Sequence, residues 1–130
     1  MRLSENSVIS VVGAGQMGAG IAQVCAQGGF AVLLVDAAIE RAQAGKAGIE
    51  KQLTRLCDKG KLEAAQRDAI LRRIEVSTAE LAYPRSDLVI EAASENRELK
   101  FAIFEQADAL AKPGAILASK IGRASCRERV

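Results

Sequence analysis

Aromatic residues are scarce in this chain: they make up 3% of its 130 residues, and it has no tryptophan and no histidine. No apolar stretch approaches the roughly 20 residues that a membrane-spanning helix needs, and the polar lead over residues 1–7 does not have the form of a signal peptide. We therefore expect a soluble, cytoplasmic protein. Hydrophobic residues make up 49% of the chain and are mainly alanine, valine, isoleucine and leucine. This composition is typical of one domain with a helix-covered sheet.

The cysteines lack the spacing of a metal site. Cys25 and Cys57 fall on predicted helices, so we expect both to be buried, reduced thiols and predict no metal. The chain shows no internal repeat and no low-complexity linker.

The most informative stretch is VISVVGAGQMGAG, residues 8–20, where an apolar run ends in three spaced glycines. The β-branched run predicts a central parallel strand buried on both faces, and apolar residues at helical spacing predict a helix from Gln16. Gly13 would allow a tight turn, Gly15 would leave the backbone open to a pyrophosphate, and Gly18 would let the helix pack close to the strand. The helix N-terminus would then stabilise the anion. We call residues 13–18 the glycine turn.

A second apolar strand, residues 31–35, ends on an acidic residue, Asp36. Together with the glycine turn, this arrangement is the dinucleotide-binding fingerprint. A carboxylate there accepts hydrogen bonds from the adenosine ribose hydroxyls and repels a 2′-phosphate, which favours NAD over NADP. Two alternatives stay open: the glycine turn could be purely structural, and Asp36 could cap the following helix, a role compatible with ribose binding.

The rest of the chain alternates helices and strands. A helical stripe from residue 39 to about 59, then a helix over about 62–73, predicts a projecting pair with a mostly solvated charged face. Further strands are predicted at 74–76, 88–90 and 115–118, with a helical turn over 78–82 that Pro84 ends and a helix over 97–110. We therefore predict an α/β fold: a truncated Rossmann-type parallel sheet of order 3-2-1-4-5, with right-handed crossovers and helices on both faces.

The last eleven residues, KIGRASCRERV, show no apolar period. IGRASCRERV is the translation of one reading frame of a widely used sequencing-library adapter, ATC GGA AGA GCG TCG TGT AGG GAA AGA GTG. We therefore expect an incomplete Rossmann domain over residues 1–119 and a non-native tail over 120–130, with residues 121–130 disordered. A genuine basic tail is the alternative.

The tail also decides the sign of the net charge. The full chain has 18 basic and 16 acidic residues, and removing the tail leaves 14 basic and 15 acidic. The formal charge then changes from +2 to −1, so we predict no nucleic-acid-binding patch.

Three motifs together are specific: GAGQMGAGIAQV, with Met17 before the third glycine, LLVD ending at Asp36, and DLVIEAASEN at residues 87–96. On these motifs, residues 7–119 resemble the NAD-binding domain of the 3-hydroxyacyl-CoA dehydrogenases, most closely the short-chain, 3-hydroxybutyryl-CoA type. The family continues after its fifth strand with Ser-Asn-Thr-Ser-Ser, whereas here Ser119 is followed by Lys120.

The resemblance assigns roles residue by residue. The positions that match NAD-binding positions of the family are Gly13, Ala14, Gly15, Gln16, Met17, Gly18, Asp36, Glu95 and Lys100. Lys59 matches a basic residue that contacts coenzyme A in the family. The alternatives are a helix N-terminal acid for Glu95, a solvated charge for Lys100, and a surface lysine near a helix C-terminus for Lys59.

The resemblance also implies an activity. In the family a histidine base, oriented by a glutamate, takes the hydroxyl proton while hydride moves from C3 of the acyl chain to the nicotinamide of NAD. This interconverts 3-hydroxyacyl-CoA and 3-oxoacyl-CoA in fatty-acid metabolism. The family's catalytic residues lie beyond the end of this sequence, so we expect the fragment to bind NAD without turnover.

The partners follow from the same resemblance. We expect a 3-hydroxyacyl-CoA substrate and a homodimer for the full-length protein, formed through the missing C-terminal domain, with no nucleic acid and no membrane. The main alternative is a non-catalytic NAD-sensing module. Such a module needs only a short crossover after Asp36, so the long helical pair favours the acyl-CoA enzyme. Another NAD-dependent hydroxyacid enzyme is a further alternative.

Overall fold

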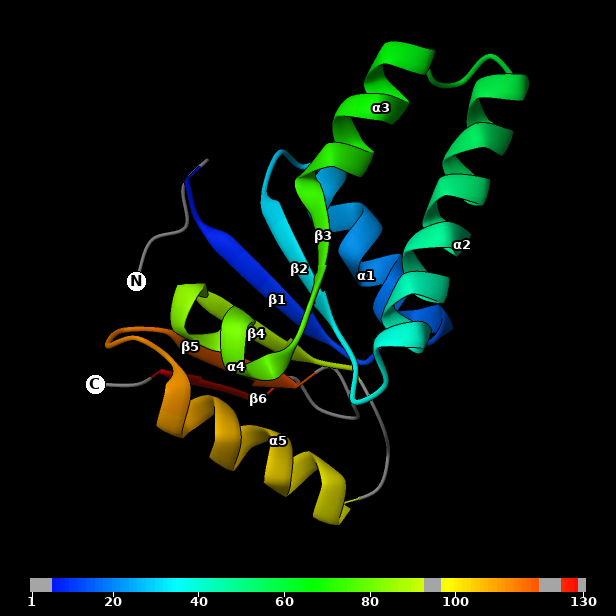
Figure 1. Ribbon diagram of the computed structural model, residues 1–130. Helices are drawn as coiled ribbons and strands as arrows, with labels where there is room; N and C mark the ends of the chain where they lie inside the picture. The colour runs from blue at the N-terminus through cyan, green and yellow to red at the C-terminus, as the bar shows by residue number, and fades with distance from the viewer. Residues whose placement is uncertain (1–5, 93–96, 120–124, 129–130) are drawn as a thin grey trace.

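The computed structural model describes residues 6–92, 97–119 and 125–128. Its centre is a six-stranded sheet with the order β3-β2-β1-β4-β5-β6 (Figure 1). The strands are β1 (Val8–Val12), β2 (Ala31–Val35), β3 (Ile74–Ser77), β4 (Leu88–Glu91), β5 (Ile116–Ser119) and β6 (Ser125–Glu128). Strands β1 to β5 pair in parallel, which confirms the predicted Rossmann-type order.

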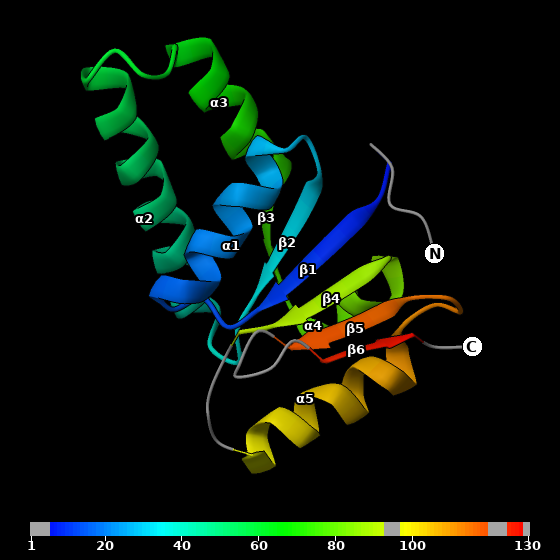
Figure 2. The ribbon, with the colours of Figure 1, turned by 180° about the vertical axis from the view of Figure 1, so that it is seen from behind.

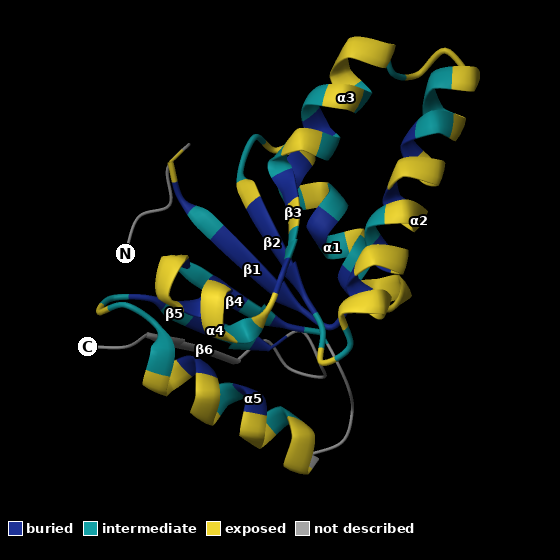
Figure 3. Ribbon diagram, viewed as in Figure 1, coloured by how far each residue is buried: buried dark blue, intermediate teal, exposed yellow. Residues whose placement is uncertain are grey.

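Helices cover both faces of the sheet (Figures 1 and 2). The helical elements are α1 (Gln16–Gln27), α2 (Ile39–Asp58), α3 (Ala64–Arg73), α4 (Ala79–Ala82), the 3-10 turn η1 (Tyr83–Arg85) and α5 (Arg97–Leu110). One hydrophobic cluster joins the sheet to α1, α2 and α3, and includes Ala22 and Ile49. The other joins it to α4, η1 and α5, and includes Tyr83 and Ile103. The strands are therefore buried between two helical layers, and the exposed residues lie mainly on the outer helix surfaces (Figure 3).

The central strand β1 brings the predicted binding residues to one edge. In the register, Val12 lies opposite Val35 of β2 on one side and opposite Glu91 of β4 on the other. Because the carboxyl ends of parallel strands meet at one sheet edge, the turns after β1 and β2 lie there beside the end of β4. This edge holds the glycine turn and Asp36.

Helices α2 and α3 form the predicted projecting pair, whose joined ends extend beyond the sheet in Figure 1. Helix α2 buries a stripe of residues along one side, namely Ala42, Gly45, Ile49 and Leu53. Helix α3 buries only Ile70 and begins at Ala64, two residues later than predicted, with a capping box between Glu63 and Gln66. The pair is thus held mainly through α2.

Two boundaries on the other side of the sheet differ from the sequence prediction. Strand β5 begins at Ile116 rather than at residue 115, because the Ala115 N–H closes a turn by donating to the Lys112 carbonyl at 3.2 Å. Pro84 ends α4 as expected, but the chain continues as η1 before β4.

The expectation that residues 121–130 are disordered is wrong for the backbone of Ser125–Glu128. This segment forms β6, antiparallel to β5, with Ser119 opposite Ser125 and Ile116 opposite Glu128. An edge strand presents unpaired N–H and C=O groups that can pair with any extended segment, whatever its side chains. Backbone pairing therefore does not require the apolar period that the tail lacks.

Cys25 and Cys57 are free thiols, each partly buried rather than buried as predicted. Burial raises the pKa of the Cys25 thiol.

Over the described ranges, none of the helices combines the length and apolar character needed to cross a membrane.

Candidate functional site

Gly13 makes the tight turn at the end of β1. Its φ is +105°, a conformation that favours glycine, and its N–H donates to the Val35 carbonyl at 2.7 Å. The chain therefore turns across the end of β2 as it leaves the sheet, as predicted for this position.

Gly18 lets α1 approach this turn. A Cβ at Gly18 would lie 1.6 Å from the Gly13 carbonyl oxygen, so the helix and the turn meet backbone to backbone. Gly15, the N-cap of α1, differs: a Cβ built there would meet no atom within 4 Å. The first turn of α1 has no acidic residue and its N-cap makes no side-chain hydrogen bond, so that turn carries no carboxylate to offset the positive end of the helix dipole.

Asp36 joins the glycine turn to the start of α2. Its Oδ2 accepts the Ala14 N–H at 3.0 Å and its Oδ1 accepts the Ala38 N–H at 3.2 Å. The N-cap of α2 is Ala38, so the alternative that Asp36 itself caps this helix is wrong. We call the carboxylate with its two N–H donors the Asp36 clamp.

Gly45 is a site residue that the sequence reasoning missed. It lies in α2, where a Cβ would be 2.8 Å from the Ala14 carbonyl oxygen and 3.0 Å from the Ala14 Cβ. Helix α2 therefore packs directly on the glycine turn. A glycine inside a helical pattern is an available signal for such close packing.

Glu91 is a second missed residue. It ends β4, is fully buried, and accepts a hydrogen bond from the Ser119 hydroxyl of β5 at 3.0 Å. This bond ties together the carboxyl ends of two strands beside the glycine turn. The sequence feature that could have indicated Glu91 is an acidic residue at the end of the otherwise apolar stretch LVIE.

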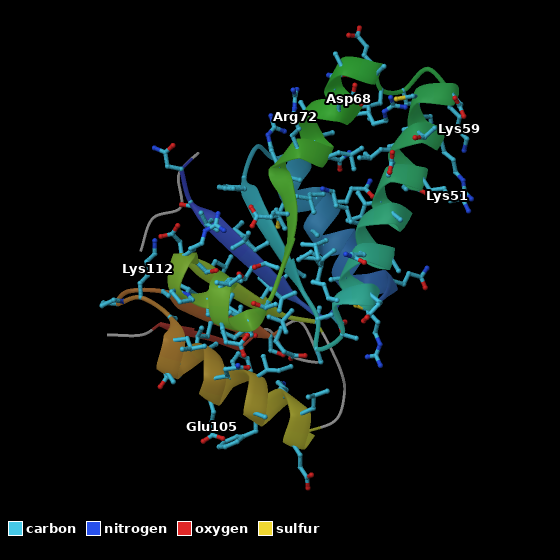
Figure 4. All side chains as sticks on the ribbon, in the orientation of Figure 1. Lys51, Lys59, Asp68, Arg72, Glu105 and Lys112 are labelled. Carbon is cyan, nitrogen blue, oxygen red and sulfur yellow. The ribbon has the colours of Figure 1, made fainter. Side chains whose placement is uncertain are left out.

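The remaining predicted residues are spread apart. Lys100 lies, half-buried, in the first turn of α5. Glu95 lies outside the described residues. Lys59 is exposed at the C-cap of α2, at the far end of the projecting pair (Figure 4). Since α2 has 20 residues at about 1.5 Å each, Lys59 is roughly 30 Å from the start of that helix and belongs to a different part of the surface.

The opposite end of β1 is held by Asp87. Its carboxylate accepts the Val8 N–H at 2.7 Å and pairs with Lys112 Nζ, labelled in Figure 4, at 2.7 Å. Burial alone would raise the pKa of the Asp87 carboxyl. The hydrogen bond and positive charge of Lys112, together with the hydrogen bond from the Val8 N–H, lower this pKa overall. This pair fixes the strand end away from the site.

Grooves border the site beside Asp36 and between α1 and α2. One, of about 450 Å³, lies beside Asp36 and is lined among others by Glu40, Thr78, Glu80 and Gln106. The other, of about 560 Å³, lies between α1 and α2 and is lined among others by Gln16, Gln23, Ile49 and Gln52. Both volumes fall in the range of small-molecule sites.

The parallel sheet, the glycine turn and the Asp36 clamp define a Rossmann-type dinucleotide-binding domain. The sequence model of the family described as "3-hydroxyacyl-CoA dehydrogenase, NAD binding domain" matches residues 8–127. The chain belongs to this family, and its cofactor is NAD.

Individual relatives agree. The chain is 47% identical over 109 residues to a "Probable 3-hydroxybutyryl-CoA dehydrogenase" of Deinococcus radiodurans, covering 84% of this chain and 39% of the relative. A protein of the same name from Bacillus subtilis is 41% identical over 111 residues, covering 85% and 39%. The crystal structure of (S)-3-hydroxybutyryl-CoA dehydrogenase from Ralstonia eutropha matches with a TM-score of 0.83 and 41% identity, covering 88% and 40%. The chain thus spans about two fifths of the length of these relatives.

Proposed function

We propose that this chain is the NAD-binding portion of an enzyme that interconverts short-chain 3-hydroxyacyl-CoA and 3-oxoacyl-CoA. The observation that carries the proposal is the Asp36 clamp, which holds a carboxylate beside the glycine turn at the end of β2. The relatives named 3-hydroxybutyryl-CoA dehydrogenase support the short-chain substrate.

The residues present fit the cofactor. Gly15 leaves open space at the start of α1, where a Cβ would otherwise stand in the path of a pyrophosphate. Each carboxylate oxygen of Asp36 accepts one N–H and keeps a second lone pair, so the clamp can still accept the ribose hydroxyls. We assign NAD binding to Gly13, Ala14, Gly15, Gln16, Met17, Gly18, Asp36, Glu95 and Lys100. When bound, NAD supplies the hydride acceptor.

We assign coenzyme A binding in the full-length protein to Lys59. Its place at the exposed tip of the projecting pair, far from the glycine turn, supports a contact with a long ligand that reaches beyond the nucleotide site (Figure 4). The resemblance extends the proposal to a cytoplasmic homodimer formed through the part of the relatives that this chain does not span.

We expect NADP to bind at least about tenfold more weakly than NAD. Two like charges about 4 Å apart at an effective dielectric near 20 repel by roughly 4 kcal/mol, and solvent exposure reduces this repulsion. Isothermal titration calorimetry at low salt and neutral pH measures both dissociation constants. Equal values would refute the role given to Asp36, and the absence of NAD binding would refute the proposed function.

We expect no NADH when the chain is mixed with NAD and 3-hydroxybutyryl-CoA. The sequence has no histidine to remove the hydroxyl proton. Absorbance of NADH measures turnover, with the full-length Deinococcus radiodurans relative as the positive control. NADH formation above a blank without acyl-CoA would show that the chain contains its own catalytic base.

We also propose that residues 120–130 are a non-native tail following an incomplete Rossmann domain over residues 1–119. Support comes from the agreement between residues 121–130 and the translated adapter. The genomic sequence downstream of the Ser119 codon tests this proposal, because a native gene encoding the same eleven residues would contradict it.

A further inference from the structure

Arg41 lies beside the Asp36 clamp and has no role in the binding described above. It is the third residue of α2, and its Nη1 is 3.6 Å from Asp36 Oδ1. The Arg41 side chain is 75% exposed, whereas that of Asp36 is 10% exposed. The carboxylate is therefore the fixed member of the pair, and the guanidinium is the member that solvent and ligands can reach.

The geometry leaves Arg41 free to change partners. Asp36 is held by the Ala14 and Ala38 N–H groups, so it does not need Arg41 to keep its position. An ion pair with one member this exposed is weak and is screened by salt. Two acidic side chains also line the adjoining groove, Glu40 in the first turn of α2 and Glu80 in α4.

A guanidinium group beside Asp36 is suited to binding a phosphate group. Asp36 stands where a dinucleotide-binding domain meets the ribose 2′ position, and a nearby arginine is the side chain that accommodates a 2′-phosphate there. Guanidinium binds phosphate through two parallel hydrogen bonds, a geometry that a single ammonium group does not provide.

We propose that Arg41 is a second specificity-determining residue at the adenosine end of the site, opposing Asp36. Asp36 repels a 2′-phosphate and Arg41 attracts it, so the preference for NAD is smaller than the carboxylate alone would give. The inference rests on the proposed NAD site and adds a residue to it. Its consequence is that NADP binding depends on Arg41 far more than NAD binding does.

Calorimetry with NAD and NADP tests this on the unsubstituted chain and on Arg41→Ala. We expect Arg41→Ala to weaken NADP binding by about threefold or more and to change NAD binding by less than about twofold, since the lost contact is with the 2′-phosphate. Arg55→Ala is the matched control: it removes the same charge from an exposed position in the last turn of the same helix. It should shift neither constant by more than about twofold.

Two further variants test the inference through an increase in NADP affinity instead of a decrease. Asp36→Asn removes the charge and keeps one of the two oxygen acceptors of the clamp, and we expect it to tighten NADP binding by about tenfold or more. Asp36→Asn combined with Arg41→Ala should bind NADP about threefold or more less tightly than Asp36→Asn alone. Because Arg41 is exposed, the comparison of Arg41→Ala with Arg55→Ala decides the inference even if the Asp36 variants do not fold.

Three results would overturn the inference. These are an unchanged NADP constant in Arg41→Ala, an equal loss in Arg55→Ala, and a double variant that binds NADP as tightly as Asp36→Asn. In each of them the unsubstituted chain still binds NAD and the proposed function stands. A chain that binds neither nucleotide would refute the proposed function, and with it the role of Arg41.

Discussion

Replacing Gly18 by alanine is expected to remove NAD binding and to lower the free energy of unfolding by roughly 1 to 3 kcal/mol or more. The added Cβ would lie 1.6 Å from the Gly13 carbonyl oxygen and 2.8 Å from its carbonyl carbon. Both are backbone atoms at the end of a buried strand, so no side-chain rotation relieves the overlap. Helix α1 has to move off the turn, which takes its N-terminus away from the pyrophosphate position. Urea unfolding and NAD calorimetry measure the two effects.

Gly20→Ala is the matched control. Gly20 lies two residues further along α1, where a Cβ would meet no atom within 4 Å. Alanine there should stabilise the helix by about 0.5 to 1 kcal/mol and leave NAD affinity unchanged. If Gly18→Ala behaved like Gly20→Ala, the close approach of α1 to the turn would not hold in solution.

Replacing Gly45 by alanine is expected to weaken NAD binding by about tenfold and to destabilise the fold by roughly 1 to 3 kcal/mol. The new Cβ would lie 2.8 Å from the Ala14 carbonyl oxygen and 3.3 Å from Leu34 Cδ2. To relieve these contacts, either α2 withdraws or the Ala14 peptide shifts. The shift would strain the 3.0 Å hydrogen bond from the Ala14 N–H to Asp36.

Gly48→Ala controls for the effect of adding alanine to the same helix. Gly48 is three residues further along α2, and a Cβ there would meet no atom within 4 Å. It should stabilise the chain by about 0.5 to 1 kcal/mol without changing NAD affinity. The difference between the two variants isolates packing against the glycine turn. Equal NAD affinities in both would mean that α2 does not support the site.

The sequence predicts the sheet and the glycine turn well because both depend on local patterns. The β-branched run of β1 and the apolar stripe of α1 lie on either side of the glycines. The order of the five parallel strands follows from the alternation of strands and helices and from the handedness of their crossovers.

The residues that the sequence missed act through contacts between distant segments. Helix α2 approaches Ala14 at Gly45, and Glu91 accepts a hydrogen bond from Ser119, 28 positions away. Neither contact leaves a period in the sequence. The sequence did not predict the pairing of β6 for another reason. This pairing uses the backbone groups of an edge strand, and side-chain patterns carry no information about them.

The Asp36 clamp also decides when conformational entropy is lost. A flexible carboxylate would have to be ordered by its ligand, at about 0.5 to 1.5 kcal/mol per immobilised side chain. Here two N–H donors from separate segments order Asp36 while the chain folds, before any nucleotide is present. The entropy cost of ordering Asp36 therefore lowers the free energy of unfolding and does not lower the affinity for the nucleotide. It follows that a substitution which loosens the start of α2 lowers nucleotide affinity even though it touches no atom of the nucleotide.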